Sequence, residues 1–129
     1  MKTKTQEIFE LSCPYGHSSQ GHHPKYLFVC SAGLLRSPTF AKVLTEIGYN
    51  TRSCGSESYA LIPLSVNLIF WADKIFFMEE FNYEGALATF SKDEDTLQEI
   101  KSKHIILGIE DKYDYNCPTL VSKAIELFT

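Results

Sequence analysis

Short continuous apolar runs alternate with longer amphipathic stretches from residue 26 onward. The run at residues 26–30 has the length of a strand and predicts a strand buried on both faces. The next apolar positions recur at helical spacing, on one face: Phe40, Val43, Leu44 and Ile47. Ser37 and Pro38 suit the first positions of that helix and Gly48 its end. The pattern thus predicts a strand followed directly by a helix.

The same alternation continues toward the C-terminus. Further strands are expected at residues 50–54, 75–78 and 104–107. Helices are expected from residue 64 to about 73, at 80–102 as one or two helices interrupted around Ser91, and at 120–128. Strands that alternate with helices predict an α/β fold with a parallel sheet covered on both faces. In such sheets ligands bind beyond the carboxyl ends of the strands, and Cys30 lies at such an end.

Length and charge narrow the classes of function. A chain of 129 residues has room for one domain with a single core. The net charge of -4 argues against a general nucleic-acid or anionic-membrane binder. The sequence contains neither an apolar run of membrane-spanning length nor a signal-peptide core, so we expect a cytoplasmic protein. Residues 1–24 resemble a polar extension, and residues 25–129 form the predicted domain.

The four cysteines have irregular spacing and form no Cys-x-x-Cys pair: Cys13, Cys30, Cys54 and Cys117. In a reducing compartment such thiols are packing residues, nucleophiles or redox partners rather than disulfides. A metal site is conceivable near the N-terminus, where thiol and imidazole ligands gather: Cys13, His17, His22 and His23. Their spacing fits no structural zinc pattern, so we expect neither a metal nor a cofactor.

The segment Cys-Ser-Ala-Gly-Leu-Leu-Arg-Ser-Pro, residues 30–38, joins the first strand to the first helix. Small residues after Cys30 allow backbone N–H groups to curl around an anion, beside the positive end of the helix dipole. Arg36 offers a bidentate fork to phosphate oxygens, and the same donors stabilise a thiolate. Ser37 is placed to hydrogen-bond the sulfur. The alternative is a packing thiol with a surface arginine, but the strand–loop–helix context favours an anion cradle with a nucleophile.

On these residues the sequence resembles the low-molecular-weight protein tyrosine phosphatases, and most closely a small bacterial and phage branch of them. Three stretches carry the resemblance: LFVCSAGLLRSPTFAKVL, WADKIFFME and LGIEDKYDYNCPTL. It implies a three-layer sandwich with a four-stranded parallel sheet in the order 2-1-3-4. It also implies a phosphate-binding loop made of Ser31, Ala32, Gly33, Leu34, Leu35 and Arg36.

The resemblance assigns catalytic roles to individual residues. Cys30 would be the nucleophile that forms a phosphocysteine, Arg36 the phosphate clamp and Ser37 the hydroxyl that assists the thiolate. Asp111 matches the general acid and Tyr113 an aromatic wall of the substrate site, to which Tyr59 could also contribute. The substrate would be a phosphotyrosine protein or a small aryl phosphate, and phosphate, sulfate or vanadate would bind the same loop. Residues 53–56 lie where the family has a serine-bearing loop that braces the phosphate loop.

Several positions depart from the better-known enzymes. Gly33 replaces a loop asparagine that contacts the serine-bearing loop, Leu35 replaces a second loop cysteine, and Lys112 replaces a proline. Where the closer branch tends to have Asp-Pro, this chain has a cysteine before Pro118. The general acid could also be Asp114, with Glu110 a more distant third candidate.

Other functions share parts of this pattern. A thiol-coupled arsenate reductase would need Cys54 or Cys117 as a redox partner of Cys30. A phosphoprotein-binding module would keep the anion cradle without turnover. A phosphotransfer component of a sugar transport system also uses a cysteine loop after a strand, but has no need of Arg36.

Overall fold

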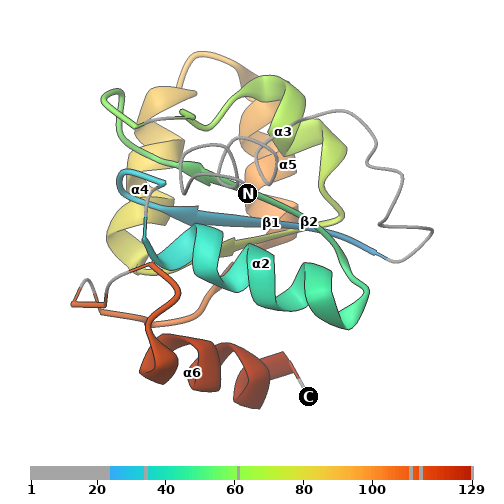
Figure 1. Cartoon of the computed structure of the whole chain (residues 1–129). Coiled ribbons are helices and arrows are strands. Elements are labelled where there is room, and N and C mark those ends of the chain that lie inside the picture. Colours follow the sequence, from blue (N-terminus) through green and yellow to red (C-terminus); the bar gives the residue numbers. More distant parts are fainter. Residues whose placement is uncertain (1–23, 34, 61, 111, 114, 129) are drawn as a thin grey trace.

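The computed structural model describes residues 24–33, 35–60, 62–110, 112–113 and 115–128 (Figure 1). Its strands are Lys25–Cys30 (β1), Asn50–Gly55 (β2), Lys74–Phe77 (β3) and His104–Ile106 (β4). They form one four-stranded sheet in the order β2-β1-β3-β4. Every pairing in it is parallel, so the sheet expected from the sequence is confirmed.

Helices cover both faces of the sheet (Figure 1). Arg36–Ile47 (α2) and Pro118–Phe128 (α6) lie together on one face. Val66–Trp71 (α3), Glu80–Thr89 (α4) and Glu94–Lys103 (α5) cover the other. The predicted three-layer arrangement is therefore confirmed, with β1 and β3 at the centre of the sheet.

Capping residues explain where the helices differ from their predicted bounds. The Ser65 hydroxyl accepts a hydrogen bond from Leu68 N, so α3 begins after it rather than at residue 64. Asp93 accepts from Thr96 N and starts α5, which divides the predicted 80–102 stretch into two helices.

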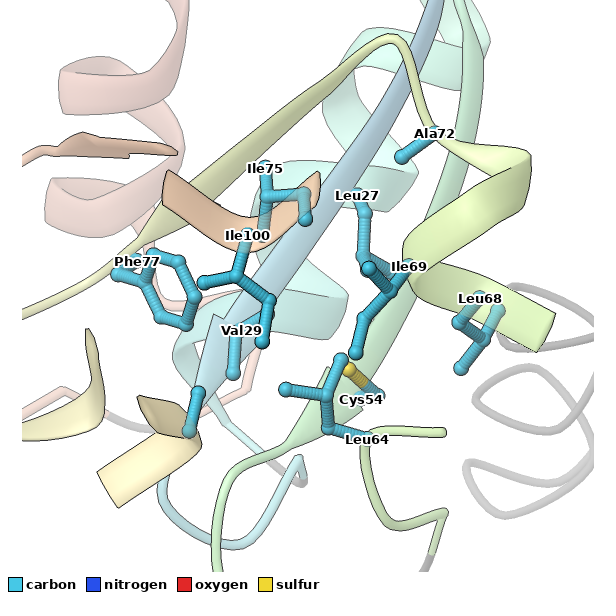
Figure 2. Packing of buried hydrophobic residues seen from close by; sticks show 11 residues of the cluster. Leu27, Val29, Cys54, Leu64, Leu68, Ile69, Ala72, Ile75, Phe77 and Ile100 are labelled. Atoms are coloured by element: carbon cyan, nitrogen blue, oxygen red, sulfur yellow. The ribbon is translucent and has the colours of Figure 1, made fainter. Parts of the chain in front are cut away.

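Two cores lie on opposite faces of the sheet. The first, the aliphatic core, packs β-strand side chains against α3, α4 and α5 (Figure 2). Its fully buried members include Leu27, Val29, Cys54, Ile69, Ile75, Phe77 and Ile100. The second, the aromatic core, packs the other face against α2 and α6 and includes Phe28, Cys30, Phe40, Phe76, Met78, Leu120 and Ala124. Alternation along β1 separates the two sets, because successive strand side chains point to opposite faces.

The predicted extension at residues 1–24 lies, apart from Pro24, outside the described residues. Across the described part of the chain, no helix is both long and apolar enough to cross a membrane.

Candidate active site

The loop between β1 and α2 folds back on the Cys30 sulfur. Gly33 N donates to Cys30 Sγ at 3.2 Å, and Gly33 has a φ of 71°, in the left-handed region that favours glycine. Arg36 follows as the first residue of α2. The Cys30 side chain is thus aimed into its own loop, beside the amino end of a helix, where anions are stabilised.

The end of β2 supports this loop from one side. A Cβ atom on Gly33 would lie 2.9 Å from the carbonyl carbon of Cys54 and 2.9 Å from Gly55 N. Ser56 N donates to Cys30 O at 2.7 Å, and Glu57 N donates to Ser31 O at 3.1 Å. Residues 53–56 therefore lie directly against the loop, where the sequence resemblance puts them.

Ser37 lies between the two strand ends. Its Oγ is 3.1 Å from Cys30 Sγ and donates to Cys54 O at 3.1 Å. The side chain is fully buried, so the hydroxyl is held in one place between a sulfur and a carbonyl.

The Arg36 side chain is only 2% exposed, so the alternative of a surface arginine is wrong. Its Nη1 donates to Glu79 Oε1 at 2.5 Å and to Ile109 O at 2.8 Å. A buried guanidinium needs such partners because an unpaired buried charge is costly. Glu79 directly precedes α4 and Ile109 follows β4, so strand ends from across the sheet orient this one side chain.

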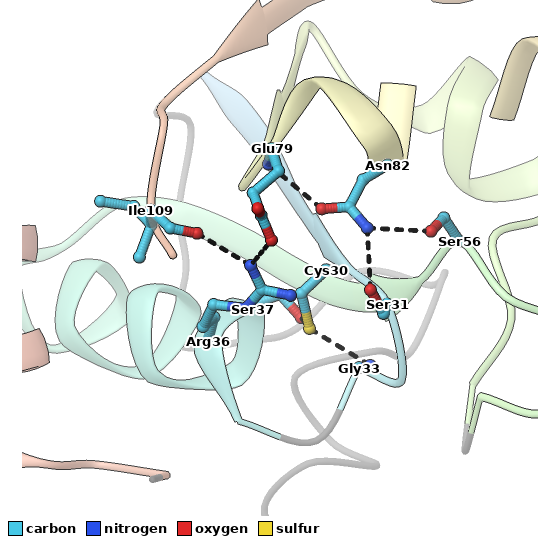
Figure 3. A network of polar contacts seen from close by, with 9 residues as sticks. All are labelled: Cys30, Ser31, Gly33, Arg36, Ser37, Ser56, Glu79, Asn82 and Ile109. Carbon is cyan, nitrogen blue, oxygen red and sulfur yellow. Dashed lines mark hydrogen bonds and ion pairs between the residues drawn. The ribbon is translucent and has the colours of Figure 1, made fainter. Parts of the chain in front are cut away.

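Asn82 adds a contact from the first turn of α4 (Figure 3). Its Nδ2 donates to Ser31 Oγ at 3.1 Å and to Ser56 Oγ at 3.2 Å, while its Oδ1 accepts from Glu79 N at 3.1 Å. Sequence reasoning missed both Glu79 and Asn82. Their signal was their place just beyond β3, at the carboxyl edge of the sheet.

The remaining predicted site residues are less closely joined to the loop. Ala32 and Leu35 are half-buried within it, and Tyr113 is half-buried against the aromatic core. Tyr59 is 67% exposed. Leu34, Asp111 and Asp114 lie outside the described residues.

Flanking the position of Asp111, Lys112 forms an ion pair with Glu110 at 3.5 Å between Nζ and Oε2. Both of these side chains are mostly exposed. In high dielectric such a pair contributes little to stability.

Cys54 and Cys117 have different surroundings from Cys30. Cys54 is fully buried in the aliphatic core, on the other face of the sheet from the aromatic core that contains Cys30. Burial, and to a smaller degree the nearby Cys30, raises the pKa of the Cys54 thiol well above its usual range. Cys117 is half-buried and packs against the aromatic core. All three are free thiols.

Within the described residues, no three His, Cys, Asp or Glu side chains gather in a way that could hold a metal ion. The N-terminal cysteine and histidines considered above lie outside those residues.

Two solved structures resemble this arrangement of strands and helices. Wzb from Vibrio vulnificus, a low-molecular-weight tyrosine phosphatase solved with benzylphosphonate, superposes with a TM-score of 0.58 at 18% sequence identity. The match covers 82% of this chain and 92% of Wzb. This chain has the fold of that phosphatase.

A protein tyrosine phosphatase from Entamoeba histolytica, solved with Hepes in its active site, gives a TM-score of 0.50 at 21% identity. That match covers 81% of this chain and 88% of the Entamoeba protein. No protein-family model and no curated protein matches the sequence.

Proposed function

We propose that this protein is a cysteine-dependent phosphomonoesterase that hydrolyses aryl phosphates, with phosphotyrosine in proteins as its substrate class. One observation carries the proposal: Cys30 Sγ accepts the Gly33 N–H at 3.2 Å inside a loop that ends at the buried Arg36. A sulfur that accepts a backbone N–H at the amino end of a helix is a nucleophile placed where an anionic substrate binds.

In the first step, the Cys30 thiolate attacks phosphorus in line with the leaving aryl oxygen. The P–S bond forms as the P–O bond breaks, and the loop amides and Arg36 bind the equatorial phosphoryl oxygens. Asp111 protonates the departing phenolate, a role that we assign from the sequence.

In the second step, the Asp111 carboxylate takes a proton from water, and the water oxygen attacks the phosphocysteine. The P–S bond breaks, phosphate leaves and the Cys30 thiolate returns. Ser37, 3.1 Å from the sulfur, stabilises that departing thiolate by donating its hydroxyl hydrogen.

The ligand of a neighbour supports an aryl substrate. Wzb holds benzylphosphonate, which joins a phosphonate to an aromatic ring. In the proposed scheme Arg36 and backbone amides supply all the positive charge at phosphorus, so no metal ion is required. The nucleophile works only as a reduced thiolate, which fits a reducing compartment such as the cytoplasm.

The position of Cys54 disfavours the arsenate reductase alternative in which Cys54 is the redox partner of Cys30. Val29 aligns with Cys54 and Cys30 with Gly55, and the Cys54 thiol is buried among aliphatic side chains. A thiol relay would need the two sulfurs to meet from opposite faces of the sheet.

The test is hydrolysis of p-nitrophenyl phosphate and of a phosphotyrosine peptide near pH 6, with EDTA present. We expect Cys30→Ser to lower kcat by more than about a thousandfold, because the nucleophile is lost. Cys117→Ser is the matched control, since it also removes a free thiol, and it should keep full activity.

Asp111→Ala should lower kcat for the peptide by about 10²–10⁴-fold, and by less for p-nitrophenyl phosphate, whose leaving group needs little protonation. Asp114→Ala is its control and should have a much smaller effect. Vanadate binding without turnover would show that the chain is a phosphate-binding module instead. Activity that survives Cys30→Ser would rule out the proposed mechanism.

A further inference from the structure

We propose that Asn82 is a positioning residue that holds the Cys30–Arg36 loop in its anion-binding form. The inference rests on the proposed function, because it concerns the same loop. Asn82 does not reach the reacting atoms; it acts through the two serines that it contacts.

The hydrogen-bonding groups of the Asn82 amide are all used. The side chain is fully buried, and each of its polar atoms has a partner. An amide has two N–H donors, and here they go to Ser31 and Ser56, hydroxyls on loops that follow two neighbouring strands. A buried polar group with all its partners fixes geometry, and removing it leaves those partners unsatisfied.

The loop has few other side chains that could fix its shape. Ala32 and Gly33 offer no polar side chain, so Ser31 carries the polar side chain closest in sequence to Cys30 on the loop. Asn82 is itself fixed by α4 and by its bond to Glu79 N.

Glu79, three residues earlier, holds Arg36 through its carboxylate. The beginning of α4 therefore contacts both ends of the loop: Ser31 just after the nucleophile and Arg36 at the end (Figure 3).

Loss of Asn82 should therefore weaken ligand binding much more than it lowers kcat. Without Asn82, the loop would occupy its anion-binding form for only part of the time. The apparent affinity of any loop ligand then falls by that fraction, equally for substrate and for vanadate. Once substrate is bound, the ligand itself orders the loop, so kcat changes far less.

The experiment compares wild type with Asn82→Ala and Ser56→Ala. For Asn82→Ala we expect vanadate binding to weaken and KM to rise by the same factor of about ten, with kcat within about threefold. Ser56→Ala removes one of the two acceptors and leaves Asn82 in place, so we expect KM and the vanadate Kd to rise by about threefold. The double variant should be no worse than Asn82→Ala alone, because both changes remove the same contact.

Asp93→Ala is the matched control, because Asp93 caps the neighbouring α5 and does not touch the loop. It should lower Tm while KM and vanadate affinity stay at the wild-type values. If Asn82→Ala behaves in the same way, with a lower Tm and unchanged binding, the inference is wrong.

Alkylation of Cys30 gives a measurement that needs no turnover. The loop should attract the anionic reagent iodoacetate to the sulfur. The ratio of the alkylation rate with iodoacetate to that with neutral iodoacetamide therefore measures how far the loop is in its anion-binding form. Asn82→Ala should lower this ratio by about tenfold.

The alkylation ratio also separates this inference from the proposed function. A wild type that shows the anion preference and binds vanadate but does not hydrolyse would overturn the proposed function, while the Asn82 effect could still be measured. A ratio that stays unchanged in Asn82→Ala would overturn the positioning role alone.

Discussion

Cys30 and Cys54 lie on neighbouring strands at the same edge of the sheet, yet their surroundings differ completely. Cys30 Sγ accepts the Gly33 N–H, lies 3.1 Å from the Ser37 hydroxyl oxygen, and belongs to a loop that ends at a buried arginine. Cys54 is packed among aliphatic side chains, and its pKa is raised by burial. The strand register separates them, since Cys30 aligns with Gly55 and its neighbour Val29 aligns with Cys54.

The difference lies in the backbone around each sulfur, and on our proposal this backbone is what makes Cys30 the nucleophile. Both residues are buried cysteines, so neither composition nor burial distinguishes them. What differs is that β1 continues into a loop that curls back over the sulfur, whereas the Cys54 side chain points into the core on the other face. Substitutions that disrupt the loop should therefore lower the reactivity of Cys30 toward that expected of a packing thiol such as Cys54.

Among the changes that test this comparison, the largest effect is expected for Gly33→Ala. The new Cβ would lie 2.9 Å from backbone atoms of Cys54 and Gly55, so the loop has to lift away from the end of β2. We expect kcat/KM to fall by more than about a hundredfold, because the donors around Cys30 lose their positions. Kinetics with p-nitrophenyl phosphate measures this loss.

Gly108→Ala controls for backbone strain. Gly108 has a φ of 73°, close to that of Gly33, but a Cβ there would meet nothing within 4 Å. It should lower Tm by a few degrees and leave kcat/KM within about fivefold. If both alanine variants lose activity equally, crowding against β2 is not what shapes the loop.

A smaller effect of opposite sign is expected for Glu79→Gln. The carboxylate that holds Arg36 also places a negative charge beside the proposed phosphate site. Glutamine keeps an oxygen to accept from Arg36 and removes that charge. Vanadate should bind about fivefold more tightly, corresponding to about 1 kcal/mol, which is modest for a partly exposed group. Weaker binding would show instead that the full charge is needed to orient the guanidinium.

The last test concerns the stability of the fold rather than activity, through Cys54 at alkaline pH. In the unfolded chain Cys54 ionises near pH 8.5, whereas burial keeps it protonated in the fold. Above that pH the unfolded state binds fewer protons, so the free energy of unfolding falls by up to about 1.4 kcal/mol per pH unit from this group.

Denaturant melts from pH 7 to 10 should therefore show a steeper alkaline loss in wild type than in Cys54→Ala. At pH 7 iodoacetamide should label Cys54 only after unfolding. Rapid labelling of folded Cys54 would contradict this expectation, because it would mean that the thiol is accessible in the fold.

The sequence predicted the parts of the site that are local. Cys30, Arg36 and Ser37 lie within eight consecutive positions, so a strand followed by a helix is enough to bring them together. The sheet itself followed from apolar runs and helical spacing, because these patterns report burial directly.

Glu79 and Asn82 could not be found in that way. Their contacts with the loop join residues 43 and 51 positions apart, and they exist only because β3 lies next to β1. The burial of Arg36 has the same origin, since its partners come from beyond β3 and β4. With the sheet order in hand, polar residues just after the strands that flank β1 are the signal to search for.

Ser37 carries one hydroxyl hydrogen and has two acceptors, the Cys30 sulfur and the Cys54 carbonyl, each 3.1 Å away. When Cys30 is a thiol, its own hydrogen can point to the hydroxyl oxygen, and the serine hydrogen goes to Cys54 O. When Cys30 is a thiolate, the sulfur can only accept, and the serine hydrogen turns toward it. The Ser37 hydroxyl hydrogen thus has two orientations. The charge on Cys30 decides between them, and so decides whether the Cys54 carbonyl keeps its hydrogen bond.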